Sequence, residues 1–435
     1  MATLQPYKKY NSVAYDYATE LPDGWQLLPN IAIFQERIDR GHINEELLSI
    51  TIGKGVIKQT DVDIKKDSSN EDKSKYKLIK VGDIAYNKMR MWQGALGYSD
   101  YQGISSPAYV ILKPKMKISP RFFHYMFRSN FYTNYSKRFS YGIVDDQLSL
   151  RYTDFKRMYS IVPPLEVQNS IVAYLDKKKR EIDKFIRNKE RLVELLELNR
   201  QRKIFDAITK GIDKNFELKE SGFPWIGLIP KHWELKKIKS FANHVQRGSS
   251  PTYVNESELV VISQASISSG FIDDAKFKYQ SKAKIEHFKG RLFKDDVLLA
   301  STGGGVLGKS IVFNREGNYI ADGHLTIIRD KKKRFNSKFL YYFLSINFDF
   351  IEGYLGQGST NQTELQRGWF RDLYLPFPEL NEQERIVDFV NEFNEEINSA
   401  ISKAQKEISS IKEYREALIT DLVTGKRSVP QLQLN

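Results

Sequence analysis

The fold is decided by two similar stretches of the chain. Residues 163–213 read PPLEVQNSIVAYLDKKKREIDKFIRNKERLVELLELNRQRKIFDAITKGID, and residues 378–428 read PELNEQERIVDFVNEFNEEINSAISKAQKEISSIKEYREALITDLVTGKRS. A shift of 215 residues aligns 147–213 with 362–428 without a gap, and 16 of the 67 aligned pairs are identical, against about four expected by chance. The chain is therefore a tandem repeat, in which a variable segment precedes each similar stretch.

Each similar stretch predicts one long amphipathic helix. In the first copy, apolar residues recur three and four positions apart, at Ile171, Leu175, Ile182, Phe185, Ile186, Leu192, Val193 and Leu196. In the second copy, a heptad-like seam of the coiled-coil type runs through Ile386, Val390, Phe393, Ile397, Ile401, Ile408, Ile411, Leu418 and Leu422. Proline opens both stretches, and Gly211 and Gly425 follow the last apolar turns, where a left-handed cap is favoured. Each helix should run about 45 residues, or about 65 Å.

The variable segments predict two mixed α/β heads. Short alternating runs, typical of strands, are broken by glycine and polar turns at residues 108–112, 259–263, 296–300 and 324–328. Residues 63–77, DIKKDSSNEDKSKYK, hold almost no apolar residue and predict a mobile loop. We therefore expect an α+β fold with two mixed α/β domains joined by two long helices, as a pseudo-twofold tandem repeat.

The charge of the chain points to a polyanionic partner. Its 67 Lys and Arg residues outweigh 54 Asp and Glu residues, which gives a net charge of +13, with a pI near 9.3. Nucleic acid is the first candidate and an anionic membrane surface the second. The absence of cysteine excludes disulfides, thiolate zinc sites and cysteine nucleophiles, and no apolar run is long enough to span a bilayer. We expect a cytoplasmic protein without a membrane partner.

One motif invites a nucleotide-binding interpretation. Residues 303–310, GGGVLGKS, satisfy the phosphate-loop pattern and follow a strand-like run at 296–300. The next residues, IVFN at 311–314, are β-branched and aromatic, so the helix that would hold the phosphates is not predicted. A glycine-rich hairpin between two strands is favoured. As a third interpretation, its backbone N–H groups and Lys309 would contact DNA phosphates.

No other pattern predicts catalysis. The only Pro-Pro pair, at 163–164, opens a helix and belongs to no methylase tetrapeptide. Two nuclease-like Asp-x-Lys fragments, at 63–65 and 274–276, are expected by accident in a lysine-rich chain. The six histidines show no spacing typical of a metal site. We therefore expect neither a catalytic residue nor a metal ligand.

Several loop clusters mix cations, aromatic rings, amides and glycine, as DNA-contacting loops do. The candidate DNA-binding residues of the first head are Lys88, Arg90, Trp92, Gln93, Arg138 and Tyr141. Those of the second head are Arg247, Ser249, Thr302, Lys309, Gln357, Ser359, Thr360 and Asn361. Each cluster alone could equally be a solvated loop, and it is their recurrence at matching positions of both heads that favours DNA.

The duplicated layout resembles the specificity (S) subunit of type I restriction-modification enzymes. The resemblance rests on PPLEVQ at 163–168 and PELNEQERIV at 378–387, on the helix ends ITKG at 208–211 and VTGK at 423–426, and on the head openings LPDGW at 21–25 and IPKHW at 229–233. The stretch DVLLASTG at 296–303 adds to it, and the glycine loop is then a family feature. In the first copy Val167 stands where the family usually has Glu before the Gln, whereas Glu382 fills that place in the second copy.

The resemblance implies a DNA-binding subunit without catalytic activity of its own, inside a complex that is both a site-specific deoxyribonuclease and an adenine-N6 methyltransferase. Target-recognition domains would occupy 1–160 and 214–375, and helices at 161–213 and 376–428 would form an antiparallel coiled coil, followed by a tail at 429–435. Two methylation (M) subunits would assemble on the helices, and restriction/translocase (R) subunits would join them. The resemblance places S-adenosylmethionine, ATP and Mg in those partners, with no cofactor in this chain.

Three functions remain at this point. The favoured one is a specificity subunit that selects a bipartite double-stranded DNA site for DNA methylation and cleavage. The alternatives are a P-loop ATPase and a duplicated coiled-coil adaptor that does not contact DNA. Nucleotide titration separates the first alternative from the favoured function, and salt-dependent binding to duplex DNA separates the second.

Overall fold

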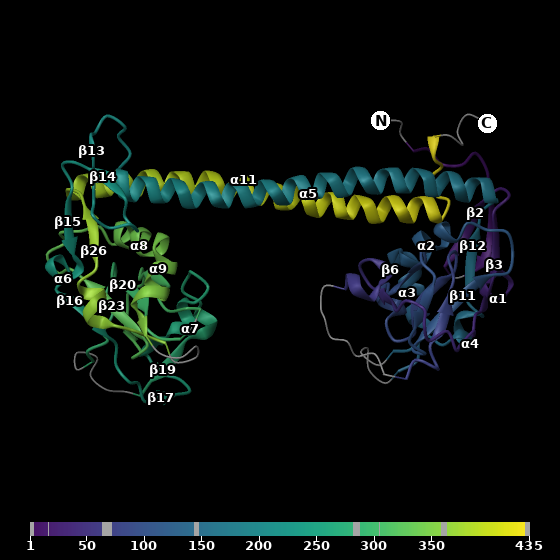
Figure 1. Ribbon diagram of the computed structural model, residues 1–435, viewed down its shortest axis with the longest axis horizontal. Coiled ribbons are helices and arrows are strands. Elements are labelled where there is room, and N and C mark those ends of the chain that lie inside the picture. Colours follow the sequence, from purple (N-terminus) through teal and green to yellow (C-terminus); the bar gives the residue numbers. More distant parts are fainter. Residues whose placement is uncertain are drawn as a thin grey trace. The chain divides into compact units, whose positions relative to one another are not determined.

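The computed structural model describes residues 4–15, 17–62, 72–142, 148–281, 288–303, 305–357 and 363–430 (Figure 1). The chain forms two compact units, Met1–Glu190 with Gln405–Asn435, and Arg191–Ala404. The boundary between the units falls within both long helices, because each end of the helix pair packs on the head at that end.

The first unit begins with a hairpin and a mixed head. Its strands are β1 (Tyr10–Tyr15), β2 (Ala18–Pro22), β3 (Gln26–Pro29), β4 (Phe34–Glu36), β5 (Leu48–Thr51), β6 (Gly55–Lys58), β7 (Lys77–Ile79), β8 (Ile84–Asn87), β9 (Leu96–Tyr98), β10 (Gly103–Ser105), β11 (Tyr109–Pro114) and β12 (Tyr159–Val162). Its helices are α1 (Asn30–Ile33), α2 (Pro120–Arg128), α3 (Asn130–Arg138), α4 (Tyr152–Phe155) and the beginning of α5 (Leu165–Lys210).

The second unit follows the same plan. Its strands are β13 (Leu218–Glu220), β14 (Leu228–Pro230), β15 (Glu234–Lys237), β16 (His244–Arg247), β17 (Tyr253–Val254), β18 (Val260–Ile262), β19 (Lys278–Gln280), β20 (Val297–Ala300), β21 (Ser310–Val312), β22 (Tyr319–Ala321), β23 (Leu325–Arg329), β24 (Gly356–Gln357), β25 (Glu364–Leu365) and β26 (Tyr374–Phe377). Its helices are α6 (Ile238–Phe241), α7 (Gln264–Ile267), α8 (Ser337–Ile346), α9 (Phe348–Leu355), α10 (Arg367–Arg371) and the first part of α11 (Leu380–Val423).

Both heads contain the same four-stranded antiparallel sheet. The strand order is β4-β11-β8-β9 in the first head and β16-β23-β20-β21 in the second, with corresponding strands in the same order along the chain. Helix α2 packs on β9, and α8 packs on β20 and β21. The expected mixed α/β heads are confirmed, and the duplication extends into the segments where sequence similarity is loose.

In each head, a buried aspartate of this sheet pairs with an arginine, which follows β4 in the first head and ends β23 in the second. The Arg37 guanidinium lies 2.7 and 3.0 Å from the Asp83 carboxylate, directly before β8. Arg329 pairs in the same bidentate way with Asp296, directly before β20. Both aspartates are buried and each also accepts a backbone N–H three residues upstream, at 2.9 and 2.8 Å. Bidentate pairing and backbone donors offset the cost of burying the charges.

The long helices confirm the sequence prediction at both ends. Their bounds, Leu165–Lys210 and Leu380–Val423, lie within two residues of the prolines and glycines predicted to mark their ends, and three to five residues inside the ranges 161–213 and 376–428. Gly211 and Gly425 adopt φ values of 76° and 79°, the left-handed caps that the sequence predicts. Among the described helices, none is long and apolar enough to cross a membrane.

The two helices pair antiparallel within each unit. In the first unit, Lys189 lies 2.5 Å from Glu407, and Asp183 lies 3.5 Å from Arg415. In the second unit, Arg200 Nη2 donates to Asn398 Oδ1 at 2.7 Å. Buried apolar side chains fill the seam near each head, among them Leu175, Ile182, Val390 and Ile397. The expected coiled coil is confirmed.

Part of the predicted apolar stripe does not enter this seam. Phe185 and Leu192 are 38% and 40% exposed, because α5 pairs with a single partner helix and its apolar residues cover more than one face. Leu195 and Leu198 are exposed as well, at 48% and 56%. The helix pair thus keeps an apolar surface beyond the contact that the two helices make with each other.

Each long helix ends against a tryptophan that opens a head. A Cβ atom added to Gly211 would stand 3.3 Å from Cζ2 of Trp233 in the second unit. A Cβ added to Gly425 would stand 2.6 Å from Pro22 and 3.0 Å from Cζ3 of Trp25 in the first unit. The glycines therefore serve both the left-handed cap and a close approach to an aromatic ring.

One loop prediction needs correction. Residues 63–71 of the loop expected at 63–77 lie outside the described residues, but the end of that segment is ordered. Tyr76 is buried, and Lys77 begins β7, where its ammonium group donates to Glu36 Oε1 and to the Tyr109 carbonyl, each at 2.9 Å. The composition of residues 63–77 did not predict that Lys77 is buried and paired, because its partners come from distant strands.

Candidate nucleic-acid interface

The predicted contact residues of the first head lie in the turn between β8 and β9. After β8 the chain forms a short 3-10 helix, Met91–Gln93, which Gly94 ends in a left-handed conformation with φ of 82°. Met91 is buried beneath the turn, whereas Arg90 and Gln93 are exposed. The sheet thus anchors a tight turn and leaves a cation and an amide on its outer side.

The structure brings the second predicted segment of this head to the same turn. The Lys137 ammonium lies 4.9 Å from the centroid of the Trp92 ring, a cation–π contact. Tyr141 pairs with Ser149 in an isolated antiparallel bridge, and the neighbouring Leu150 donates its N–H to the Lys88 carbonyl at 2.8 Å. Residues 88–93 and 137–141 therefore form one surface, which we call the first-head surface.

The first-head surface is cationic. Burial lowers the pKa of Lys88, and the nearby Lys77 and Arg151 lower it further. Arg138 is exposed at the end of α3, and Tyr141 is 72% exposed. Phosphate oxygens placed here would relieve the repulsion between these cations, so the geometry suits a nucleic-acid backbone.

The glycine loop of the second head is a hairpin. Strands β20 and β21 pair antiparallel, and Ala300 N–H donates to the Lys309 carbonyl at 2.8 Å. Ser310 begins β21, a strand, at the point where a nucleotide-binding loop needs the N-terminus of a helix. The predicted glycine-rich hairpin is confirmed, and its backbone is not arranged as a phosphate loop for ATP.

The Lys309 side chain has a partner of its own. Its ammonium group donates to the Ser268 carbonyl at 3.0 Å, which holds it against the end of α7. In the same hairpin, the Gly305 N–H donates to Glu352 Oε1 at 2.5 Å. Groups predicted to contact phosphate are thus engaged within the protein, and a phosphate would have to compete with a carbonyl and a carboxylate for them.

The remaining described candidates of the second head lie around this hairpin. Arg247, at the end of β16, lies 3.3 Å from the Glu364 carboxylate. Thr302 forms an isolated bridge with Glu364, which places both next to Arg247. Ser249 pairs with Asp322 in another isolated bridge, and its hydroxyl accepts the Gly290 N–H at 3.1 Å. The structure thus brings Arg247 and Thr302 together at Glu364, and it holds Ser249 in an adjoining turn.

The last predicted cluster is largely outside the described residues. Gln357 lies at the end of β24, where its backbone pairs with Glu364, and its side chain is not described. Ser359, Thr360 and Asn361 lie outside the described residues. Their proposed contact with DNA remains a prediction.

Sequence reasoning missed two polar residues at this hairpin. Thr302 Oγ1 lies 3.0 Å from Gln264 Oε1 and 2.8 Å from His324 Nδ1. Gln264 begins α7, and His324 stands directly before β23, far away along the chain. No local pattern marks either residue, because only the pairing of distant strands brings them to Thr302. We call Gln264, Thr302 and His324 the hairpin triad.

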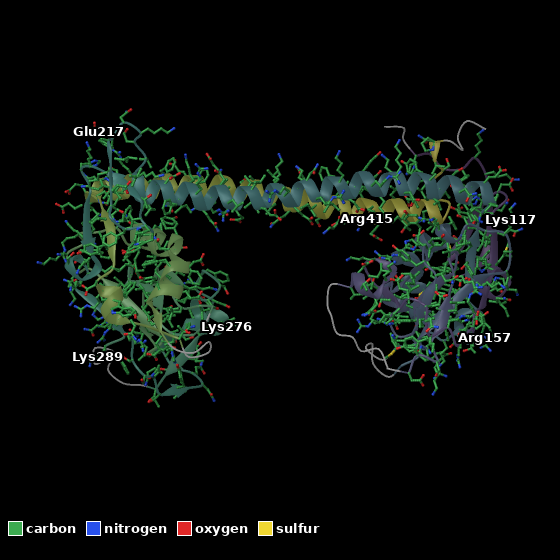
Figure 2. All side chains as sticks on the ribbon, in the orientation of Figure 1. Lys117, Arg157, Glu217, Lys276, Lys289 and Arg415 are labelled. Atoms are coloured by element: carbon green, nitrogen blue, oxygen red, sulfur yellow. The ribbon has the colours of Figure 1, made fainter. Side chains whose placement is uncertain are left out.

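Charged side chains cover the outer faces of the described structure, as the exposed Lys276 beside α7 and Arg157 in the first head illustrate (Figure 2). Within the described ranges, no group of three or more His, Asp or Glu side chains could hold a metal ion. The site that the structure offers is thus a set of polar and basic loops at the β8–β9 and β20–β21 turns.

Comparison with known proteins gives a consistent result. Residues 230–409 match the family model of the type I restriction modification DNA specificity domain. A putative type I restriction enzyme MjaX specificity subunit from Methanocaldococcus jannaschii is 25% identical over 443 residues, covering 97% of this chain and 98% of that protein. The type I restriction enzyme MjaVIII specificity subunit of the same organism is 22% identical, covering 82% and 84%.

Solved structures share the fold over nearly the whole chain. A chain from a structure described as "Structural basis underlying complex assembly and conformational transition of the type I R-M system" has a TM-score of 0.72 at 16% identity, with 93% of this chain and 99% of that chain covered. The HsdS subunit from Thermoanaerobacter tengcongensis has a TM-score of 0.57 at 18% identity, with 93% and 98% covered. The chain is thus similar in sequence to type I restriction enzyme specificity subunits, and its duplicated heads and paired long helices share the fold of the two solved structures.

Proposed function

We propose that this chain selects the DNA site of a type I restriction-modification complex, and that each head binds one half of a bipartite double-stranded sequence. One observation carries the proposal. Both heads share a four-stranded sheet of the same order, yet the turn after β8 in the first head differs completely from the turn after β20 in the second. That turn carries Arg90 and Trp92 in the first head and a glycine hairpin in the second. A common scaffold with dissimilar loops suits one task performed on two different sequences.

The basic surplus supplies affinity without sequence preference. Lysine and arginine side chains that neutralise phosphates release counterions, so binding should weaken steeply as salt rises. Specificity must come from groups that meet base edges, since phosphates are the same at every step of the duplex. The first-head surface combines both kinds of group, whereas the hairpin triad supplies polar groups that can meet base edges.

The helices are proposed to dock the partner subunits. Leu192, Leu195 and Leu198 keep 40–56% of their surface exposed, and Tyr414 on α11 keeps 47%. Apolar residues on a helix that already has a partner suit a further helical contact. Two methylation subunits and the restriction/translocase subunits are the proposed partners.

The catalytic steps are assigned to the methylation and restriction/translocase subunits. S-adenosylmethionine, ATP and Mg are proposed to bind there, and this chain is proposed to act in the cytoplasm without a cofactor of its own. Its role is to deliver the selected site to the methylation and nuclease subunits. We also propose that the length of α5 and α11 sets the unread spacer between the two half-sites.

The function is tested by mapping methylated adenines in a host that carries this chain together with its methylation subunit. The proposal predicts one bipartite motif that disappears when the gene for this chain is removed. Duplex DNA binding by the assembled complex should fall linearly on a plot of log affinity against log salt. Methylation that is independent of this chain, or a salt-independent affinity, would contradict the proposal and favour an adaptor that does not contact DNA.

A further inference from the structure

The hairpin triad forms a continuous hydrogen-bond chain from three separate elements. Gln264 comes from α7, Thr302 from the end of β20 and His324 from the turn before β23. The backbone N–H of His324 also donates to Asp322 Oδ1 at 3.0 Å, which fixes the turn that carries the imidazole ring. Asp322 is buried, whereas His324 is exposed. A rigid turn therefore presents the ring to solvent.

The position of each proton in this hydrogen-bond chain follows from its donors and acceptors. Thr302 has one hydroxyl proton, and it donates that proton to Gln264 Oε1 at 3.0 Å. The Thr302 oxygen, 2.8 Å from His324 Nδ1, must then accept a proton from that nitrogen. A neutral imidazole carries only one N–H, so His324 Nε2 is left without a proton and can only accept.

The same hydrogen bonds fix the orientation of the Gln264 side-chain amide. Its carbonyl oxygen is occupied by the Thr302 hydroxyl, so its NH₂ group remains available to donate. The described part of the chain supplies no hydrogen-bond partner for that NH₂ group or for His324 Nε2. The triad thus offers one fixed acceptor and one donor group, on two side chains that are both hydrogen-bonded to Thr302.

A fixed acceptor excludes the DNA backbone as its target. Phosphate and deoxyribose oxygens in duplex DNA only accept hydrogen bonds, so they repel the lone pair on His324 Nε2. Base edges in the major groove do provide donors: the amino groups at N6 of adenine and N4 of cytosine. Next to each amino group lies an acceptor, which suits the NH₂ group of Gln264.

We propose that the hairpin triad reads one base pair of the second half-site, with His324 Nε2 accepting from the exocyclic amino group of adenine or cytosine and Gln264 donating to the acceptor beside it. This inference rests on the proposed function, because it requires that the second head binds duplex DNA. Thr302 is a positioning residue, which acts by holding the imidazole in the Nδ1–H form. The first head has no counterpart to this triad at its β8–β9 turn, where Arg90 and Trp92 lie.

The test maps the methylated motif of complexes that carry single substitutions. His324→Ala should relax one position of the second half-site by about tenfold in discrimination and leave the first half-site unchanged. Thr302→Val should relax the same position, and Thr302→Ser should retain the original motif because its hydroxyl is kept. The identity of the relaxed base distinguishes adenine from cytosine.

His232→Ala is the matched control. His232 belongs to the same unit and is similarly exposed, but its Nε2 lies 3.1 Å from Glu382 Oε2 at the start of α11. Its substitution should leave both half-sites unchanged. If His324→Ala weakens binding to all sequences equally, or leaves the motif intact, the inference is wrong although the proposed function stands. If the unsubstituted complex produces no bipartite motif, the proposed function itself fails.

A second measurement does not depend on DNA. Long-range ¹⁵N spectra of the full chain with labelled histidine report which ring nitrogen carries the proton. The inference predicts the Nδ1–H form for His324, assigned by its loss in His324→Ala, and a shift away from that form in Thr302→Val. An Nε2–H form in the unsubstituted chain would overturn the inference.

Discussion

The side-chain oxygen of Gln383 accepts a hydrogen bond from the backbone N–H of Asn336 at 2.8 Å. Its amide donates in turn to a proline carbonyl five residues earlier, also at 2.8 Å. Gln168, the equivalent residue of the repeat, binds the backbone N–H of Ser119 at 2.8 Å and a proline carbonyl at 2.7 Å. Each buried glutamine thus ties the start of a long helix to the N-cap of α2 or α8.

Replacing Gln383 should destabilise the second unit. Gln383→Leu leaves a backbone N–H and a carbonyl without their partners, and the free energy of unfolding should fall by about 1–3 kcal/mol. Denaturant unfolding of the full chain measures the change. Gln405→Leu, at an exposed position of α11, is the control and should change stability by less than about 0.5 kcal/mol. Equal effects of the two substitutions would show that the buried hydrogen bonds contribute nothing.

Arg138→Ala should weaken DNA binding by a similar factor for all sequences. If the exposed guanidinium neutralises one phosphate, the slope of log affinity against log salt should become shallower by about one unit. Lys117→Ala removes the same charge from an exposed position before α2 and should leave the slope unchanged. An identical slope for Arg138→Ala and the unsubstituted complex would remove Arg138 from the interface.

Lys309→Ala should test whether the glycine hairpin binds DNA or a nucleotide. Because the ammonium group binds the Ser268 carbonyl, its loss should loosen the hairpin and weaken DNA binding modestly. No effect on nucleotide binding is expected, since a strand follows the loop. Calorimetric titration with ATP and with DNA measures both. An ATP affinity that changes with this substitution would restore the ATPase interpretation.

The stability of the first unit should depend on the protonation of His124. Burial, with smaller contributions from Arg128 and Arg121, lowers the pKa of this imidazole to about 3. The unfolded chain binds the proton near pH 6.5, so His124 contributes stability above that pH and loses it as pH falls toward 3. His124→Gln should reduce the slope of unfolding free energy between pH 6.5 and 5, by up to about 1.4 kcal/mol per pH unit. His42→Gln, at a half-buried position, is the control, and equal slopes for all three proteins would contradict this origin.

The spacer between the half-sites should follow the length of the helices. Inserting four residues into α5 after Asn188 and four into α11 at the facing Glu407 adds about 6 Å, which corresponds to one to two base pairs at about 3.4 Å each. The half-site bases should not change. Two-residue insertions rotate the apolar seam by about 200° and should impair assembly instead. A spacer of unchanged length after the four-residue insertions would mean that the helices only dock partners.

The helices and their ends could be predicted because their determinants are local. An apolar period, a preceding proline and a glycine after the last turn lie within one segment, and Gly211 and Gly425 adopt the predicted left-handed conformation. Strands could be predicted from short runs rich in apolar residues, as in β20 and β23. Their order in the sheet could not be predicted, because β23 pairs with both β16 and β20 over long separations.

The candidate site was predicted only where one loop carries several suitable residues. The segments around Trp92 and Tyr141 meet as one surface, which composition suggested but could not show. Gln264 and His324 were missed because each is a lone polar residue until the sheet brings it to Thr302. The burial of Lys77 was missed for the same reason, since its partner Glu36 lies on another strand.

The most direct test of the account replaces residues 1–160 with the corresponding head of another specificity subunit and maps methylated adenines in the host. Because each head is proposed to bind its own half-site, one half of the bipartite motif should change to that of the donor, while the other half and the spacer stay the same. A change in both halves, or in neither, would contradict the claim that two heads on one repeated scaffold read DNA independently.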